Sequence, residues 1–372
     1  MKVVPVTTGR QLKQFIRFPC RLYRGDACYV PEIYLAQQFL FDKRRHPFFK
    51  HSLVCFFLAL EGNSVLGRIA AIKNTIHNAF YNDTTGFFGF FEVIPSPEAA
   101  SALLQAAIAW LEAEGMTTVL GPVNYTTNDP CGLLVDGFDL PPAVKMPYNK
   151  SYYSDYLERS GFTGHMDLYA YVLEASFRSA KLERLAAAAE KRIRELGIII
   201  RNIDMHRYHE EVLALRDVYN ETNKHNWGFV PMTEEEFLDQ AGDLKQIMPP
   251  NLMFIAEKNN KIIGFFCVIP NINEVLIRIR QGRLFPMGWL KLLLYKKRVK
   301  TGRFPILGIL PEYRSSGLGL CIYSRIHKAI IEHGFRQVEA SYVLENNSMV
   351  NKLLTHWQAR KTKQYRLYRY DF

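Results

Sequence analysis

The sequence contains the same local pattern twice, and this duplication restricts the fold more than any other feature. Residues 59–72 and residues 256–269 each consist of an apolar β-rich run, a polar turn with Gly or Asn, and a second β-rich run. Such a pattern is typical of a β-hairpin. At roughly 150 residues per domain, a chain of 372 residues has room for two domains. The sequence therefore predicts two related domains.

The order of elements after each hairpin is also repeated. Each half is expected to continue with a strand, a long helix, a second strand, a short helix and a final aromatic strand. In the first half Ser96 is the expected N-cap of the long helix, Pro97 its first residue and Gly115 its stop. The expected ranges are 87–93, 97–114, 118–124, 152–160 and 169–173 in the first half, and 304–310, 318–333, 337–342, 348–357 and 364–370 in the second.

Four consecutive alanines and alternating charges in residues 175–197 predict a helical connector. The predicted division is thus 1–174, 175–197 and 198–372. With 48% hydrophobic and 22% charged residues, the composition is that of a globular protein. We find no long apolar run and no signal-peptide pattern, which predicts a cytoplasmic protein. The six cysteines include no CxxC pair, so we expect reduced thiols and no metal site.

The most informative local string is residues 314–319, Arg-Ser-Ser-Gly-Leu-Gly, between a predicted buried strand and an amphipathic helix. Free backbone N–H groups at a helix start, the helix dipole and glycines that allow close approach together favour a pyrophosphate. The string is neither a Walker loop nor a Rossmann fingerprint. The candidate cofactor-binding residues in it are Arg314, Ser315, Ser316, Gly317, Leu318 and Gly319.

In this position, Arg314-x-x-Gly317-x-Gly319 resembles the acyl-CoA signature of the GNAT acyltransferase superfamily, Arg/Gln-x-x-Gly-x-Gly/Ala between the fourth strand and the next helix. The resemblance implies an α/β (α+β) fold of two tandem GNAT-like domains, each a mixed, mostly antiparallel sheet flanked by helices. It also implies acyl-CoA or acetyl-CoA as cofactor, with acyl carrier protein as an alternative donor. A backbone N–H around Gly308, Ile309 and Leu310 is then expected to stabilise the oxyanion.

The first half departs from this signature. Residues 94–98, Ile-Pro-Ser-Pro-Glu, stand at the corresponding place, with no glycine pair and with a carboxylate at the helix start. Because that carboxylate would repel an anion, we expect the first domain to lack the pyrophosphate loop and to serve the acceptor or the structure.

A longer resemblance is narrower. Strings such as 46–49 (His-Pro-Phe-Phe), 67–72 (Gly-Arg-Ile-Ala-Ala-Ile) and 146–149 (Met-Pro-Tyr-Asn) are similar to a bacterial tandem-GNAT family that includes the bacterial ceramide synthases. That family implies transfer of a long acyl group from a CoA-type thioester to a primary amine, a sphingoid base. The alternatives are an acetyl-CoA-dependent N-acetyltransferase of a small amine or peptide, and a non-catalytic acyl-CoA-binding, membrane-peripheral module.

Amide formation from a thioester needs a neutral amine and a proton for the departing thiolate. Around the expected strand 337–342, Glu339 and Glu345 are candidate bases, and Ser341 and Tyr342 are candidate acids. A solvated strand position for Glu339 and a helix cap for Glu345 are the open alternatives. Many GNAT enzymes place a tyrosine acid seven residues after the asparagine of the last helix, where this chain has Leu354, so the resemblance assigns no acid. Water, a tyrosine of the other domain, or a thiolate that leaves without an acid are the open alternatives to Ser341 and Tyr342.

Two polar loops of the first half are candidates for acceptor binding. One carries Asn124, Asn128 and Asp129, and the other carries Tyr148 and Asn149 beside Pro147. Ordinary turn chemistry is the alternative for both loops.

Much of the net charge of +11 comes from one segment, since no acidic residue lies between Arg278 and Arg303. Within it, residues 284–300 place Phe285, Trp289 and several leucines beside lysines and arginines. This combination suits a helix in an anionic membrane interface, which predicts peripheral attachment to the inner face of the membrane. The alternative is a helix packed on the protein with a basic edge. No nucleic-acid recognition module is visible, so nucleic acid is not an expected partner.

Overall fold

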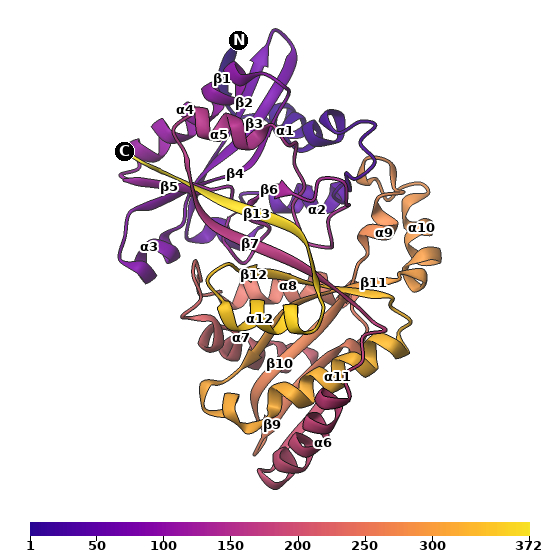
Figure 1. Cartoon of the computed structure of the whole chain (residues 1–372). Helices are drawn as coiled ribbons and strands as arrows, with labels where there is room; N and C mark the ends of the chain where they lie inside the picture. Colours follow the sequence, from indigo (N-terminus) through magenta and orange to yellow (C-terminus); the bar gives the residue numbers. More distant parts are fainter. The chain divides into compact units, whose positions relative to one another are not determined.

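The computed structural model describes all 372 residues, which form two compact units (Figure 1). Unit 1 comprises Met1–Tyr169, Asn273–Lys297 and Thr362–Phe372. Unit 2 comprises Ala170–Ile272 and Arg298–Lys361. Each half of the chain has strands and helices in the order that the sequence predicts, so the α/β fold class is confirmed.

The strands of unit 1 follow the order β1-β2-β3-β4-β5-β13, and β6 also pairs with β13. Their neighbours are antiparallel except for the parallel pair β4 and β5. The strands are β1 (Lys2–Pro5), β2 (Leu53–Glu61), β3 (Ser64–Lys73), β4 (Thr85–Val93), β5 (Thr118–Gly121), β6 (Leu133–Asp136), β7 (Thr163–Glu174) and β13 (Arg360–Asp371). Strand β7 begins in unit 1 and ends in unit 2.

The helices of unit 1 are α1 (Gly9–Leu22), α2 (Tyr34–Leu40), α3 (Thr75–Tyr81), α4 (Pro97–Ala113), α5 (Tyr153–Arg159), α9 (Asn273–Leu276) and α10 (Gly288–Tyr295). Helix α4 begins as predicted, with Pro97 in its first turn and the Ser96 side chain accepting from the Ala99 N–H. Its Leu103 and Leu111 are fully buried against the strands. A Cβ on Gly67 of β3 would lie only 2.7 Å from Leu103, so this glycine lets helix and sheet approach closely.

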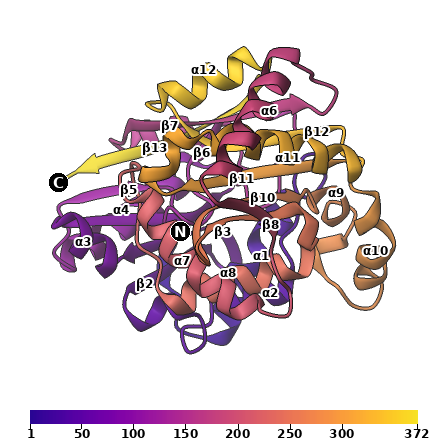
Figure 2. The same ribbon diagram turned by 90° about the horizontal axis from the view of Figure 1, so that it is seen from below.

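Unit 2 contains the strand order β12-β11-β10-β9-β8, in which only β11 and β12 are parallel. The strands are β8 (Ile198–Asn202), β9 (Met253–Lys258), β10 (Lys261–Pro270), β11 (Thr301–Ile309) and β12 (Gln337–Leu344). The helices are α6 (Ala180–Glu195), α7 (Tyr208–Asn223), α8 (Glu234–Ile247), α11 (Leu318–Glu332) and α12 (Ser348–His356). Figure 2 shows α7 and α8 on one side of these strands and α6 with α11 on the other.

The last strand of the chain, β13, pairs with β5 of unit 1, although it follows the second half of the chain in sequence. Tyr368 is in register with Gly121 of β5, and Asp371 accepts a hydrogen bond of 2.8 Å from the Thr118 hydroxyl. The contacts therefore differ from the predicted division, in which 198–372 formed one domain. The reason is that an aromatic, alternating pattern predicts a strand but does not specify the strand that pairs with it.

Asn273–Lys297 also lies with unit 1. Gly282 approaches the backbone of Glu32 so closely that a Cβ would lie 1.7 Å from the Glu32 carbonyl oxygen.

None of the helices in either unit combines the length and apolar character needed to cross a bilayer.

The pairing of β13 with unit 1 generates a prediction. Tyr368 is fully buried, so Tyr368→Ala should lower the free energy of unfolding by about 3–5 kcal/mol, and hydrogen exchange should rise in β5 of unit 1. Phe372→Ala, at an exposed position of the same segment, is the matched control. If only the amides of β8–β12 lost protection from hydrogen exchange, the placement of β13 in unit 1 would be contradicted.

Candidate active site

The parallel strands β11 and β12 of unit 2 pair only over their first residues. Thr301 to Phe304 are in register with Gln337 to Ala340, and no pairing follows. Strand β11 continues along β10, and the Leu310 N–H donates to the Ile263 carbonyl at 2.9 Å. The N–H and C=O groups of successive strand residues point to opposite edges. Because Leu310 points to β10, the N–H and C=O of Ile309 point to the edge that β12 has left. A backbone donor is therefore available where the strands part.

The predicted loop follows this edge. Pro311–Ser316 form 3-10 turns, Gly317 has a φ of 93°, and α11 starts at Leu318. The protein itself occupies one amide, since Leu318 N–H donates to Ser316 Oγ at 3.2 Å. A Cβ on Gly319 would meet nothing within 4 Å. There is thus open space beside Gly319 at the start of α11.

Arg314 and Gly308 have local structural contacts. Arg314 donates from Nε to the Ile309 carbonyl at 3.2 Å and from Nη2 to the Thr222 carbonyl at 3.3 Å, which fastens the loop to β11 and α7. A Cβ on Gly308 would lie 2.7 Å from the Phe265 ring. These two residues shape the loop, while Ser315 is exposed on its surface.

Three of the four candidate catalytic residues lie in one network on β12. Arg303 donates from Nε to Ser341 Oγ and from Nη2 to the Ser341 carbonyl, each at 2.9 Å, and lies 5.7 Å from the centre of the Tyr342 ring. Ser341 Oγ donates to Glu339 Oε1 at 2.9 Å. Glu339 is buried, so the alternative of a solvated strand residue is wrong. Glu345 is exposed and does not cap α12, because Asn347 accepts from the Val350 N–H.

The parallel strands of unit 1 also part after a short pairing. Thr85 to Phe87 are in register with Thr118 to Leu120. Beyond this, Asn124 Oδ1 accepts a hydrogen bond of 2.7 Å from the Phe90 N–H. An asparagine side chain thus takes the place of a strand partner at Phe90, which has a φ of 50°.

An irregularity between β3 and β4 sets the direction of the next side chains. The register shifts between the pairs Ala70–Gly89 and Arg68–Glu92, so β4 contains an extra residue. Phe88 and Phe91 consequently both belong to the core cluster, out of strict alternation. Glu92 is turned to the face of its cross-strand partner Arg68.

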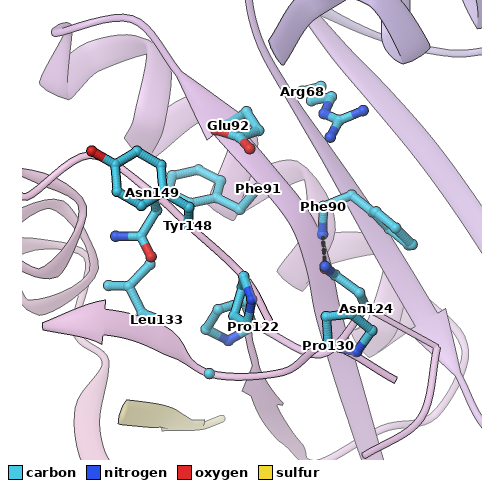
Figure 3. Close-up of a pocket in the computed structure, with 12 residues that line it drawn as sticks. Arg68, Phe90, Phe91, Glu92, Pro122, Asn124, Pro130, Leu133, Tyr148 and Asn149 are labelled. Carbon is cyan, nitrogen blue, oxygen red and sulfur yellow. Dashed lines mark hydrogen bonds between the residues drawn. The ribbon is translucent and has the colours of Figure 1, made fainter. Parts of the chain in front are cut away.

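Arg68 and Glu92 line an open cavity in unit 1, together with Asn124, Tyr148 and Asn149 (Figure 3). Glu92 Oε2 accepts from the hydroxyls of Tyr23 at 2.6 Å and Tyr153 at 2.8 Å. Burial raises the pKa of Glu92. The cavity therefore has a carboxylate whose charged form is disfavoured by its surroundings.

Arg68 is only 6% exposed. Its guanidinium lies 4.9 Å from the centre of the Phe15 ring and donates from Nη1 to the Phe15 carbonyl at 2.9 Å. Its Nε is buried and has no hydrogen-bond partner. A buried charged donor in this state is uncommon.

Of the five candidate acceptor residues, Asn124, Tyr148 and Asn149 line the cavity. The Asn149 amide is already used, since it accepts from the Leu134 N–H at 2.7 Å and donates to the Leu134 carbonyl at 3.1 Å. Tyr148 donates to Asp26 Oδ1 at 3.1 Å. Asn124 retains an amide nitrogen that donates to no group of the protein.

Asn128 and Asp129 lie elsewhere, in a turn closed by Thr126. The Asn128 N–H donates to Thr126 Oγ1 at 3.0 Å, and that hydroxyl donates to Asp129 at 3.2 Å. Turn chemistry therefore accounts for the contacts of these two residues with Thr126.

Reasoning from the sequence did not single out Arg68 and Glu92. The available signal was a charged residue within each of two neighbouring apolar strands, one basic and one acidic. Isolated charges in buried strands need a partner, and the two found here are cross-strand partners.

The helix that follows β4 begins without free space for an anion. Pro97 carries no N–H, the Ala99 N–H donates to Ser96 Oγ at 3.2 Å, and Ser96 Oγ donates to Glu98 at 2.9 Å. This differs from the open start of α11.

Comparison with curated proteins finds similarity along nearly the whole chain. The chain is 34% identical over 365 residues to Protein YghO of Escherichia coli, covering 96% of this chain and 92% of that protein. It is 32% identical over 375 residues to the Bacterial ceramide synthase of Caulobacter vibrioides, covering 99% and 97%. No protein-family model matches the chain.

Solved structures share the fold at low identity. A tandem GNAT protein from the clavulanic acid biosynthesis pathway, solved without AcCoA, superposes with a TM-score of 0.57 at 10% identity and covers 100% of this chain and 98% of that one. A GCN5-related N-acetyltransferase from Sphaerobacter thermophilus gives a TM-score of 0.52 at 12% identity, with coverage of 99% and 95%. These matches confirm the expected tandem GNAT fold.

The buried carboxylate predicts a pH dependence of stability. Because burial raises the pKa of Glu92 in the folded state, the folded chain binds more protons than the unfolded chain. The stability contributed by Glu92 is therefore present below the unfolded pKa of about 4.3 and is lost as pH rises through the folded pKa. Relative to the wild type, Glu92→Gln should gain free energy of unfolding between pH 4 and pH 7, measured by urea titration.

The exposed Glu61 at the end of β2 supplies the control Glu61→Gln for the loss of one negative charge. A difference between Glu92→Gln and the wild type that stays constant or shrinks as pH rises would contradict this prediction.

Proposed function

This chain is an acyltransferase that belongs to the family of the Bacterial ceramide synthase of Caulobacter vibrioides and Protein YghO of Escherichia coli, and we propose that it transfers a long acyl group from a CoA-type thioester to the amino group of a sphingoid base. The observation that carries this proposal is the 32% identity to the ceramide synthase over 99% of the chain. Because the similarity is nearly complete in length, it includes both units.

The donor is proposed to bind where β11 leaves β12. The loop and the start of α11 suit a pyrophosphate because Gly319 has open space beside it and helix N-termini favour anions. The open edge at Ile309 offers a backbone N–H to a thioester carbonyl. When bound, the thioester supplies an activated acyl carbon and a thiolate leaving group, whether its carrier is CoA or acyl carrier protein.

The proton transfers are proposed to use the network on β12. The amine nitrogen forms the new bond to the acyl carbon as the carbon–sulfur bond breaks, so one proton must leave nitrogen and one must reach sulfur. Glu339 is the proposed base. Ser341, whose Oγ donates to Glu339 at 2.9 Å, is the proposed route by which a proton returns to the thiolate.

An exposed apolar segment favours a lipid acceptor over a small soluble amine. Around α10, Phe285 is 72% exposed, and Met287 and Leu294 are each 58% exposed. Exposed Lys291, Lys296 and Lys297 lie on the same segment. We propose that this segment lies in the interface of an anionic membrane, where apolar side chains enter the lipid and lysines meet its headgroups.

A turnover assay tests the proposed function. With D-erythro-sphinganine as acceptor, palmitoyl-CoA should give amide with a kcat/KM at least about 10-fold above that of acetyl-CoA, because burying a long chain adds binding energy. A higher rate with acetyl-CoA would replace the proposal by an N-acetyltransferase of small amines. Thioester binding without any amide product would indicate a non-catalytic acyl-CoA-binding module.

The donor site is tested in the same assay by Gly319→Glu, which adds a negative charge at an open position. We expect the KM for palmitoyl-CoA to rise at least about 10-fold, because the carboxylate repels the pyrophosphate. Gly319→Ala, which also fits the open space, is the control. Gly317 is unsuitable because its φ of 93° makes any substitution there strained. An unchanged KM in Gly319→Glu would overturn the site.

Membrane attachment is tested by vesicle sedimentation. The double variant Phe285→Ser/Trp289→Ser should bind vesicles containing phosphatidylglycerol several-fold more weakly than the wild type, because two exposed aromatic side chains are lost from the interface. Met349→Ser, at an equally exposed apolar position on α12, is the control. Equal binding of the double variant, or equal binding of the wild type to neutral vesicles, would contradict the membrane assignment.

A further inference from the structure

The cavity of unit 1 contains three polar atoms that the protein leaves without a hydrogen bond. Arg68 Nε is a buried donor without a partner. Asn124 accepts from Phe90 through Oδ1, and its Nδ2 donates to no protein group. Glu92 receives both tyrosine hydroxyls on Oε2, and its Oε1 has no hydrogen-bond donor. The set consists of two donors and one carboxyl oxygen that acts as an acceptor (Figure 3).

The position of Arg68 explains why its Nε stays unpaired. The guanidinium is fixed on one side by the Phe15 ring and by its bond to the Phe15 carbonyl. Glu92 is its cross-strand partner, yet no ion pair joins the two side chains within 4.0 Å. A buried charged donor without a hydrogen-bond partner lowers the stability of the fold. The arrangement therefore suits a ligand that supplies an oxygen acceptor.

The same atoms exclude several classes of ligand. A phosphate or carboxylate would satisfy Arg68 but would bring a second acidic group against the Glu92 carboxyl, whose pKa burial already raises. A metal ion would find a single carboxylate beside a guanidinium. An acyl chain would suit the walls formed by Phe90, Pro122 and Leu133 but would leave all three polar atoms unpaired.

We infer that this cavity binds the polar head of the acceptor, an amine with hydroxyl groups on the neighbouring carbons. Glu92 Oε1 accepts a hydrogen bond from the amine, Arg68 Nε donates to the oxygen of one hydroxyl, and Asn124 Nδ2 donates to the oxygen of the other. This inference rests on the proposed function and deepens it, because it names the chemistry by which an amino diol is distinguished from a simple amine. Recognition of the acceptor head is thereby assigned to unit 1.

A comparison of two acceptors tests the role of Arg68 in the full chain, which is needed because Thr362–Phe372 complete unit 1. Sphinganine and octadecylamine have the same chain length, but octadecylamine lacks both hydroxyls. For the wild type we expect kcat/KM with palmitoyl-CoA to be at least about 10-fold higher for sphinganine. Arg68→Lys retains the charge and loses Nε, so it should reduce this preference several-fold.

The preference is a ratio, so a smaller folded fraction of the variant does not change it. Arg159→Lys, on the exposed side of α5, is the matched control and should retain the full preference. An unchanged preference in Arg68→Lys would overturn the inference, as would a wild type that uses octadecylamine as well as sphinganine.

A second variant separates acceptor binding from donor binding. Glu92→Gln should raise the KM for sphinganine about 10-fold while the KM for palmitoyl-CoA stays unchanged, because only the amine is proposed to face the Glu92 carboxyl. A fall in kcat with both KM values unchanged would overturn the assignment of Glu92 to acceptor binding.

Failure of the proposed function would be recognised separately. If the wild type forms no amide from either amine, the proposed function fails, and calorimetric titration with sphinganine then judges the cavity alone. Binding to the wild type that weakens at least about 10-fold in Arg68→Lys and Glu92→Gln would support the inference. No binding, or equal binding to all three proteins, would overturn it.

Discussion

The separation of two parallel strands after a short pairing is the constraint on which both candidate sites depend. In unit 1 the Phe88 carbonyl is the last group on this edge with a backbone partner, the Val123 N–H at 2.8 Å, and in unit 2 the pairing ends at Phe304. Beyond these points each strand keeps one paired edge and loses the other. The backbone groups on the lost edge must find other partners. Unit 1 supplies a side chain, Asn124, to the Phe90 N–H. Unit 2 supplies Arg314 to the Ile309 carbonyl, and the Ile309 N–H on the same edge is the donor proposed for the thioester.

The two units have diverged at the helix that follows this separation. In α4 a proline, a capping serine and Glu98 occupy the first turn, so its amides and its dipole are already engaged. At the start of α11, Gly317 and Gly319 stand where α4 has its proline, serine and glutamate. Only Ser316 contributes a side-chain acceptor there. A small change in residue type therefore accounts for open space at the start of α11 and for an occupied start in α4.

The local elements could be predicted from the sequence, but their partners could not. Hairpins, helix caps and strand alternation depend on neighbouring residues, and the predicted order matches α4, α5, α11 and α12 closely. The pairing of Tyr368 with Gly121 depends on contacts that no local pattern encodes. The cavity was missed for a similar reason, because strict alternation would place Glu92 on the same face as Phe88. The extra residue in β4 reverses this.

Two buried arginines differ in whether the protein satisfies their hydrogen-bond donors. Arg303 meets Ser341 through both its Nε and its Nη2, so the fold accounts for its position by itself. Arg68 is equally buried, yet its Nε meets nothing. Burying a charge with an unsatisfied donor lowers stability, and proteins commonly retain such a cost where a ligand must be recognised. This contrast supports the proposed division of labour, in which unit 2 stabilises the reacting thioester and unit 1 recognises the acceptor.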